Sequence, residues 1–169
     1  MSANRALVVV LFVFTALLVQ TTVLSRLGFL GARPDLVLVV VVCLALTDGP
    51  GVGMFAGFGA GLLQDLLSDH TLGMLALVLC CVGYAAGIVR AYLDRLAITT
   101  PMLFVGVATT GATLGFGALL ALLGDPRVSP VGLVRSVALT ALYDVVLTPF
   151  VFAAVSALSD RVDDAKRVG

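Results

Sequence analysis

The sequence predicts an all-α membrane protein in which about six transmembrane helices form one compact bundle. Of its 169 residues, 60% are hydrophobic and 12% are charged, and the mean hydropathy is +1.16. A soluble domain is about half apolar and about one quarter charged. The apolar residues are concentrated in long runs that short polar segments separate, and this is the pattern of a polytopic membrane protein.

Six hydrophobic segments are counted as membrane spans. We expect them at residues 6–24, 34–47, 51–67, 72–89, 100–123 and 131–158 of a single transmembrane domain (1–160), followed by a short, frayed hydrophilic tail (161–169). The second span is the weakest, because its apolar run from Leu36 to Leu46 covers about 17 Å at about 1.5 Å per residue. The sequence Asp48-Gly49-Pro50-Gly51 ends that run, so five crossings with one re-entrant segment is the alternative.

The distribution of positive charge predicts the orientation in the membrane. With six crossings and a cytoplasmic N-terminus, the cytoplasmic side carries Arg5, Arg90, Arg95, Arg161, Lys166 and Arg167. The outer side then carries Arg26, Arg33, Arg127 and Arg135. The positive-inside rule therefore favours a multi-pass protein of the inner (plasma) membrane with both termini in the cytoplasm. The net charge is zero, so no basic surface is predicted for binding nucleic acid.

Glycines recur at four-residue spacing in three of the segments. The pairs and the triplet are Gly53, Gly57 and Gly61 in the third segment, Gly83 and Gly87 in the fourth, and Gly111 and Gly115 in the fifth. Apolar surface gains nothing by leaving lipid, so membrane helices associate through close packing, and small residues let two backbones approach. We call Gly53, Gly57 and Gly61 the glycine seam. The sequence leaves open whether this seam packs helices within the bundle or forms a partner interface.

Two carboxyl groups lie in or beside apolar runs. Asp65 follows the glycine seam by one helical turn, and it either reaches the outer headgroup region or turns inward to hydrogen-bond a neighbouring helix or a partner. Asp144 lies deep in the last segment and needs partners from other helices. Its role is either a structural hydrogen bond or part of a polar pocket, for which Gln64 and Arg135 are the other candidates.

The residue types do not predict a catalytic, metal or cofactor site. The chain has one His, no Glu, no nucleophile elbow and no glycine-rich loop followed by Lys that could cradle a phosphate. Its three cysteines, Cys43, Cys80 and Cys81, lie in apolar runs, where they suit helix packing. We therefore expect neither an enzyme nor a bound cofactor.

Four motifs follow one another between residues 33 and 89. Arg-Pro-Asp at 33–35 opens a very apolar helix, and a glycine-rich run beginning Gly-Phe at 57–58 ends at Asp65. Leu-Gly-Met at 72–74 and Gly-Tyr-x-x-Gly at 83–87 come next. In this order the motifs resemble those of the bacterial rod shape-determining protein MreD family.

The resemblance implies a non-enzymatic scaffold of the cell-elongation machinery, the elongasome. Such a scaffold binds MreC and helps to couple MreB filaments to peptidoglycan synthesis by RodA and a class B penicillin-binding protein. The resemblance also implies a helical fold similar to the substrate-binding S components of energy-coupling-factor transporters, which supplies an alternative function, the S subunit of a vitamin-uptake transporter. The scaffold is favoured because the A-x3-A coupling motif of those subunits is absent from the first segment, where Gln20 follows Ala16 by four residues.

Overall fold

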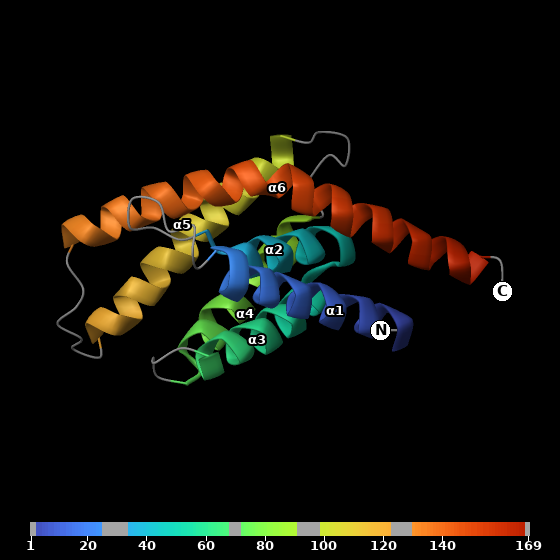
Figure 1. Cartoon of the computed structure of the whole chain (residues 1–169), viewed down its shortest axis with the longest axis horizontal. Helices are drawn as coiled ribbons and strands as arrows, with labels where there is room; N and C mark the ends of the chain where they lie inside the picture. The colour runs from blue at the N-terminus through green and yellow to red at the C-terminus, as the bar shows by residue number, and fades with distance from the viewer. Residues whose placement is uncertain (1–2, 25–33, 68–71, 91–98, 123–129, 168–169) are drawn as a thin grey trace.

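The computed structural model describes residues 3–24, 34–67, 72–90, 99–122 and 130–167, and almost all of them are helical (Figure 1). The elements are α1 (Ala3–Val19), which continues as the π-helix η1 (Gln20–Leu24), α2 (Leu36–Asp48), α3 (Pro50–Leu67), α4 (Met74–Val89), α5 (Thr99–Leu122) and α6 (Pro130–Arg167). The predicted all-α class is confirmed.

Two of the described helices are long and apolar enough to cross a membrane by length and composition. These spans are Pro101–Leu120 in α5 and Val137–Ala157 in α6. Ala6–Thr22, Leu36–Asp48 and Met74–Val89 are shorter apolar helices. The structure is therefore consistent with a helical membrane protein, and six crossings stay a prediction.

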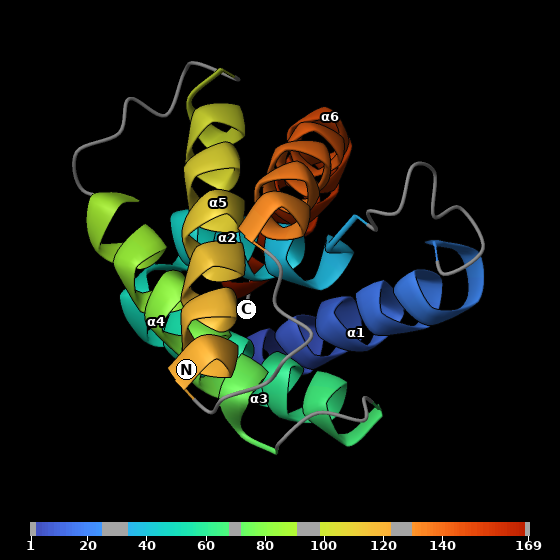
Figure 2. The same cartoon turned by 90° about the vertical axis from the view of Figure 1, so that its left-hand side faces the viewer.

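The short helix α2 lies at the centre of the bundle. Neighbouring helices contact one another in a closed order, from α3 to α4, α5, α6, α1 and back to α3, and α2 contacts all five. Figure 2 shows these five helices around α2. Every residue from Val37 to Leu46 is buried. Because protein encloses α2, its 13 residues do not have to match the thickness of the lipid.

A tight turn at Gly49 separates α2 from α3. Gly49 has a φ of 98°, in the left-handed region that favours glycine, and its N–H donates to the carbonyl oxygen of Ala45 at 2.9 Å. Pro50 then takes the first position of α3, where a backbone N–H would have no hydrogen-bond partner within the helix. The break predicted at residues 48–51 is thus a C-cap followed at once by a new helix.

The surrounding helices present apolar side chains outward. Leu7 of α1, Phe55 of α3, Leu77 of α4, Leu103 of α5 and Phe150 of α6 are all more than half exposed. A soluble bundle of amphipathic helices places polar side chains on this face. An apolar exterior of this extent suits contact with lipid or with other membrane helices.

Helix α6 is the longest helix and bends near its middle (Figure 1). Pro149 lies inside it, and a proline ring removes one backbone N–H and presses on the preceding turn, which explains the bend. Beyond the bend α6 continues to Arg167. The hydrophilic segment from residue 161, expected as a frayed tail, is thus helical through most of its length.

Candidate functional site

The glycine seam packs against α4 of the same chain. A Cβ atom added to Gly53 would lie 2.4 Å from the carbonyl oxygen of Gly83, and one added to Gly57 would lie 2.2 Å from that of Leu79. A Cβ atom on Gly61 would meet the first turn of α4 at 2.4 Å. All three contacts are to backbone atoms, so the backbones of α3 and α4 touch along the whole seam.

The glycines of α4 complete this contact from the other side. A Cβ atom on Gly83 would lie 2.2 Å from the carbonyl oxygen of Gly53, and one on Gly87 would lie 2.2 Å from the Cα atom of Pro50. The face of α3 that the seam forms is therefore occupied within the bundle. The side of α3 that stays accessible carries Phe55 and Phe58, which are at least half exposed.

Asp65 caps the N-terminus of α4 from the last turn of α3. Its side chain is 1% exposed. Oδ2 accepts hydrogen bonds from the N–H groups of Gly73 at 2.9 Å and Ala76 at 3.2 Å, and Oδ1 accepts one from Leu75 at 3.3 Å. The first N–H groups of a helix lack partners within the helix, and that end of the helix dipole favours negative charge. Of the two alternatives for Asp65, the structure shows the one in which its side chain turns inward and hydrogen-bonds a neighbouring helix.

A group of polar side chains surrounds the buried N-terminus of α2. We call this group the α2 cluster; its members are Gln20, Asp35, Gln64, Thr109 and Asp144. Asp35 is the N-cap, because its Oδ1 accepts the N–H of Leu38 at 3.1 Å. Oε1 of Gln20 accepts the N–H of Val37 at 2.9 Å. Nε2 of Gln64 donates to Oδ1 of Asp35 at 3.5 Å.

Asp144 links α6 to this cluster. Its side chain is fully buried, and its Oδ1 accepts the backbone N–H of Asp35 at 2.8 Å. Its Oδ2 accepts the hydroxyl of Thr109 at 2.8 Å. The hydroxyl of Thr148 donates to the backbone carbonyl oxygen of Asp144 at 2.7 Å, just before the bend in α6. One carboxyl group thus joins α2, α5 and α6 inside the bundle.

The α2 cluster contains some of the residues expected from the sequence and two that sequence reasoning missed. Gln64 and Asp144 were both candidates, whereas the side chain of Arg135 lies outside the described residues. Asp35 was missed as a site residue, although an Asp directly before an apolar helix is a recognisable N-cap. Thr109 was also missed, and nothing in the sequence separates it from the other threonines of α5.

We expect Thr109→Val to lower the stability of the bundle by about 1 kcal/mol, because it removes a buried hydrogen bond between two helices. Its neighbour Thr110 donates to the carbonyl oxygen of Gly106 within α5 at 2.8 Å, so Thr110→Val is a matched control. The control should change stability by less than about 0.5 kcal/mol. Thermal unfolding in detergent, followed by circular dichroism, measures both. Equal losses of stability in the two variants would show that the hydrogen bond between Thr109 and Asp144 has no specific effect on stability.

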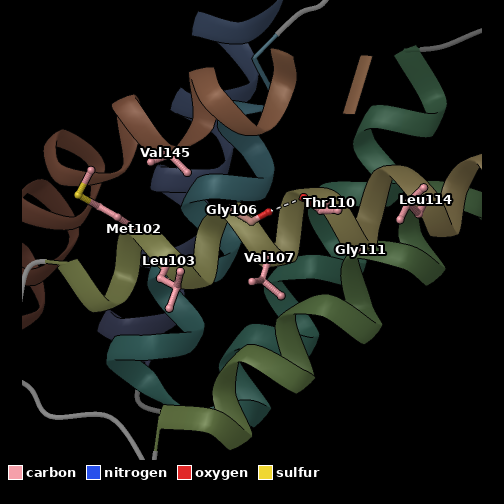
Figure 3. A pocket seen from close by; sticks show the side chains of 8 residues that line it. All are labelled: Met102, Leu103, Gly106, Val107, Thr110, Gly111, Leu114 and Val145. Carbon is pink, nitrogen blue, oxygen red and sulfur yellow. Dashed lines mark hydrogen bonds between the residues drawn. The ribbon is translucent and has the colours of Figure 1, made fainter. Parts of the chain in front are cut away.

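A shallow apolar groove runs along the outer side of α5 (Figure 3). Its volume is about 700 Å³, and it is lined by Met102, Leu103, Gly106, Val107, Thr110, Gly111 and Leu114 of α5 and by Val145 of α6. The hydroxyl of Thr110 already donates to Gly106, as Figure 3 shows. A Cβ atom added to Gly111 would meet nothing within 4 Å. The groove therefore offers packing surface and little polar chemistry.

Within the described ranges, no three His, Cys, Asp or Glu side chains lie close enough together to hold a metal ion.

The comparisons with known proteins yield one family. The family model of the rod shape-determining protein MreD matches residues 1–156. No curated protein and no solved structure matches the chain. The matched range begins before α1 and ends within α6, so it extends well beyond the motifs of residues 33–89.

Proposed function

The chain belongs to the MreD family of rod shape-determining proteins, and from this membership we propose that it is a non-enzymatic membrane scaffold of the bacterial cell-elongation machinery. In this role it binds MreC and helps to couple MreB filaments to peptidoglycan synthesis by RodA and a class B penicillin-binding protein. The observation that carries the proposal is the family match over residues 1–156.

Two features of the bundle support a scaffold. The buried carboxyl groups of Asp65 and Asp144 accept hydrogen bonds from the same chain, so both have a structural use. The five helices around α2 expose large apolar side chains. A protein with this exterior recognises other membrane helices by packing rather than by a pattern of charges.

The same proposal includes an inner-membrane location, several crossings and two cytoplasmic termini. The excess of Arg and Lys on the side that holds both termini supports it. Fusions of the C-terminus to a fluorescent protein and to alkaline phosphatase test the orientation. We expect fluorescence from the first and no phosphatase activity from the second, and the reverse would contradict it.

We expect the chain to co-purify with MreC from detergent-solubilised membranes and to restore the rod shape of cells that lack their own MreD. Cell length-to-width ratio measured by microscopy and the amount of MreC retained on the tagged chain are the two readouts. The vector without the chain is the control for shape. Round cells and no retained MreC, at a normal membrane level of the protein, would contradict the proposal.

The groove along α5 does not support the vitamin-uptake alternative. The groove along α5 is almost entirely apolar, and a small polar ligand needs convergent hydrogen-bonding groups. A ligand at 100 times its dissociation constant would stabilise the bundle by about 2.7 kcal/mol. We expect a panel of vitamins to leave the melting temperature unchanged.

A further inference from the structure

The helices of the bundle form two groups, and the contacts within the first group differ in kind from those of the second. Helices α2, α3 and α4 meet through glycines: a Cβ atom on Gly53 would lie 2.5 Å from Cβ of Ala45 in α2 and 2.4 Å from Gly83 in α4. We call these three helices the glycine-packed unit. Gly106, Gly111 and Gly115 of α5 make no such contact with that unit. A Cβ atom on Gly106 would meet Val145 of α6, and one on Gly111 would meet nothing.

Helices α5 and α6 contact each other, and few of their residues are fully buried. The share of buried residues is 22% in the span Pro101–Leu120 and 17% in the span Val137–Ala157. In lipid, apolar side chains gain little by exchanging a lipid tail for a neighbouring helix. A polar group that loses its hydrogen bond in an apolar medium is costly, so hydrogen bonds distinguish the docked arrangement from a separated one.

The bond between Asp144 of α6 and the backbone N–H of Asp35, at 2.8 Å, crosses from the α5–α6 pair to α2. The second bond of Asp144, to Thr109, stays within the pair. We propose that the α5–α6 pair is a movable unit that the Asp35–Asp144 bond holds on the glycine-packed unit. Loss of this bond lets the pair separate from α2 while α2, α3 and α4 stay packed. The proposal does not depend on which partners the protein binds.

The native cysteine Cys43 can report whether the α5–α6 pair separates from α2. Val41 and Ala45 of α2 face α4 and α3, because Cγ1 of Val41 lies beside Gly83 and Cβ of Ala45 lies beside Gly53. At about 100° per residue, Cys43 is about 200° around the helix from both of them, on the opposite side of α2. We expect that side to face α6, because α6 lies opposite α3 and α4 in the order of helices around α2. Cys43 is fully buried.

The test measures how fast N-ethylmaleimide labels one thiol of the full chain in detergent. The first background carries Cys80→Ser and Cys81→Ser, so that Cys43 supplies the thiol that is labelled. The second also carries Cys43→Ala and Val41→Cys, which places the thiol on the face of α2 toward α3 and α4. Each background is measured with and without Asp144→Ala.

We expect Asp144→Ala to raise the labelling rate of Cys43 about 10-fold or more and that of Val41→Cys less than about 2-fold. Asp144→Asn keeps an oxygen that can accept the N–H of Asp35, so it should label like the parent. Thr109→Val leaves the Asp35–Asp144 bond in place, so it should raise the labelling rate of Cys43 much less than Asp144→Ala does. Where Asp144→Ala does not yield folded protein, Asp144→Leu, which keeps the γ-branched shape of the side chain without the acceptor, replaces it.

Two results would overturn the proposal. An equal rise at both thiols means that the bundle opens as a whole, so that α5 and α6 are not a separate unit. No rise at Cys43 means that the Asp35–Asp144 bond does not hold the pair in place.

Discussion

Gly57→Ala is expected to disrupt the bundle, whereas Gly111→Ala should leave it intact. Both substitutions put alanine inside a helix, where alanine is favoured over glycine by about 1 kcal/mol in soluble helices. At Gly57 the new Cβ atom would lie 2.2 Å from the carbonyl oxygen of Leu79. That atom belongs to the backbone of α4, so the two helices must move apart. At Gly111 the Cβ atom meets nothing within 4 Å.

The expected loss at Gly57 is about 3 kcal/mol or more, because separation of the helices also weakens the contacts at Gly53 and Gly61. Circular dichroism during heating in detergent gives the melting temperature, and size-exclusion chromatography gives the monodisperse fraction. Gly111→Ala should match the parent in both. If Gly57→Ala also matched the parent, the seam would not be packed on α4, and the partner-interface alternative would return.

The positions of the helices could be predicted closely from the sequence. The expected span 100–123 corresponds to α5 at Thr99–Leu122, and 51–67 corresponds to α3 at Pro50–Leu67. Long apolar runs and the Gly and Pro residues that end them act locally, so the sequence alone carries this information. The continuation of α6 after residue 160 was not evident from the sequence, because a hydrophilic segment can continue a helix that an apolar segment has already nucleated.

The pairing of the glycines could not be predicted. Gly57-x3-Gly61, Gly83-x3-Gly87 and Gly111-x3-Gly115 have the same spacing in the sequence. In the structure the first two face backbone across the α3–α4 contact, and the third is open. Spacing determines which residues share a helix face, and the packing of the whole bundle determines what that face meets.

The α2 cluster could not be predicted from the sequence for a related reason. Asp144 bonds to Asp35, 109 residues away, and to Thr109, 35 residues away. The sequence shows that a carboxyl group deep in an apolar helix needs partners. It does not identify them, because a backbone N–H at the start of α2 has no signature of its own beyond the N-cap residue that precedes the helix.

Asp65→Ala is expected to lower the stability of the bundle by about 3 kcal/mol. It removes the acceptor of three backbone N–H groups, those of Gly73, Leu75 and Ala76, where the side chain is 1% exposed and water cannot replace it. Asp65→Asn keeps one acceptor oxygen but loses the charge that the helix N-terminus favours, so a loss of about 1–2 kcal/mol is expected. Leu66→Ala, at a side chain that is 63% exposed, is the control and should change stability little.

Melting temperatures in detergent rank these variants, and hydrogen exchange locates the damage. Exchange should rise most at the start of α4 in Asp65→Ala. Because Asp65 supports α4, a loss of MreC co-purification in Asp65→Ala should accompany the loss of stability. If MreC binding were lost while melting and exchange matched the parent, Asp65 would belong to the partner interface, and its hydrogen bonds to α4 would have no energetic importance.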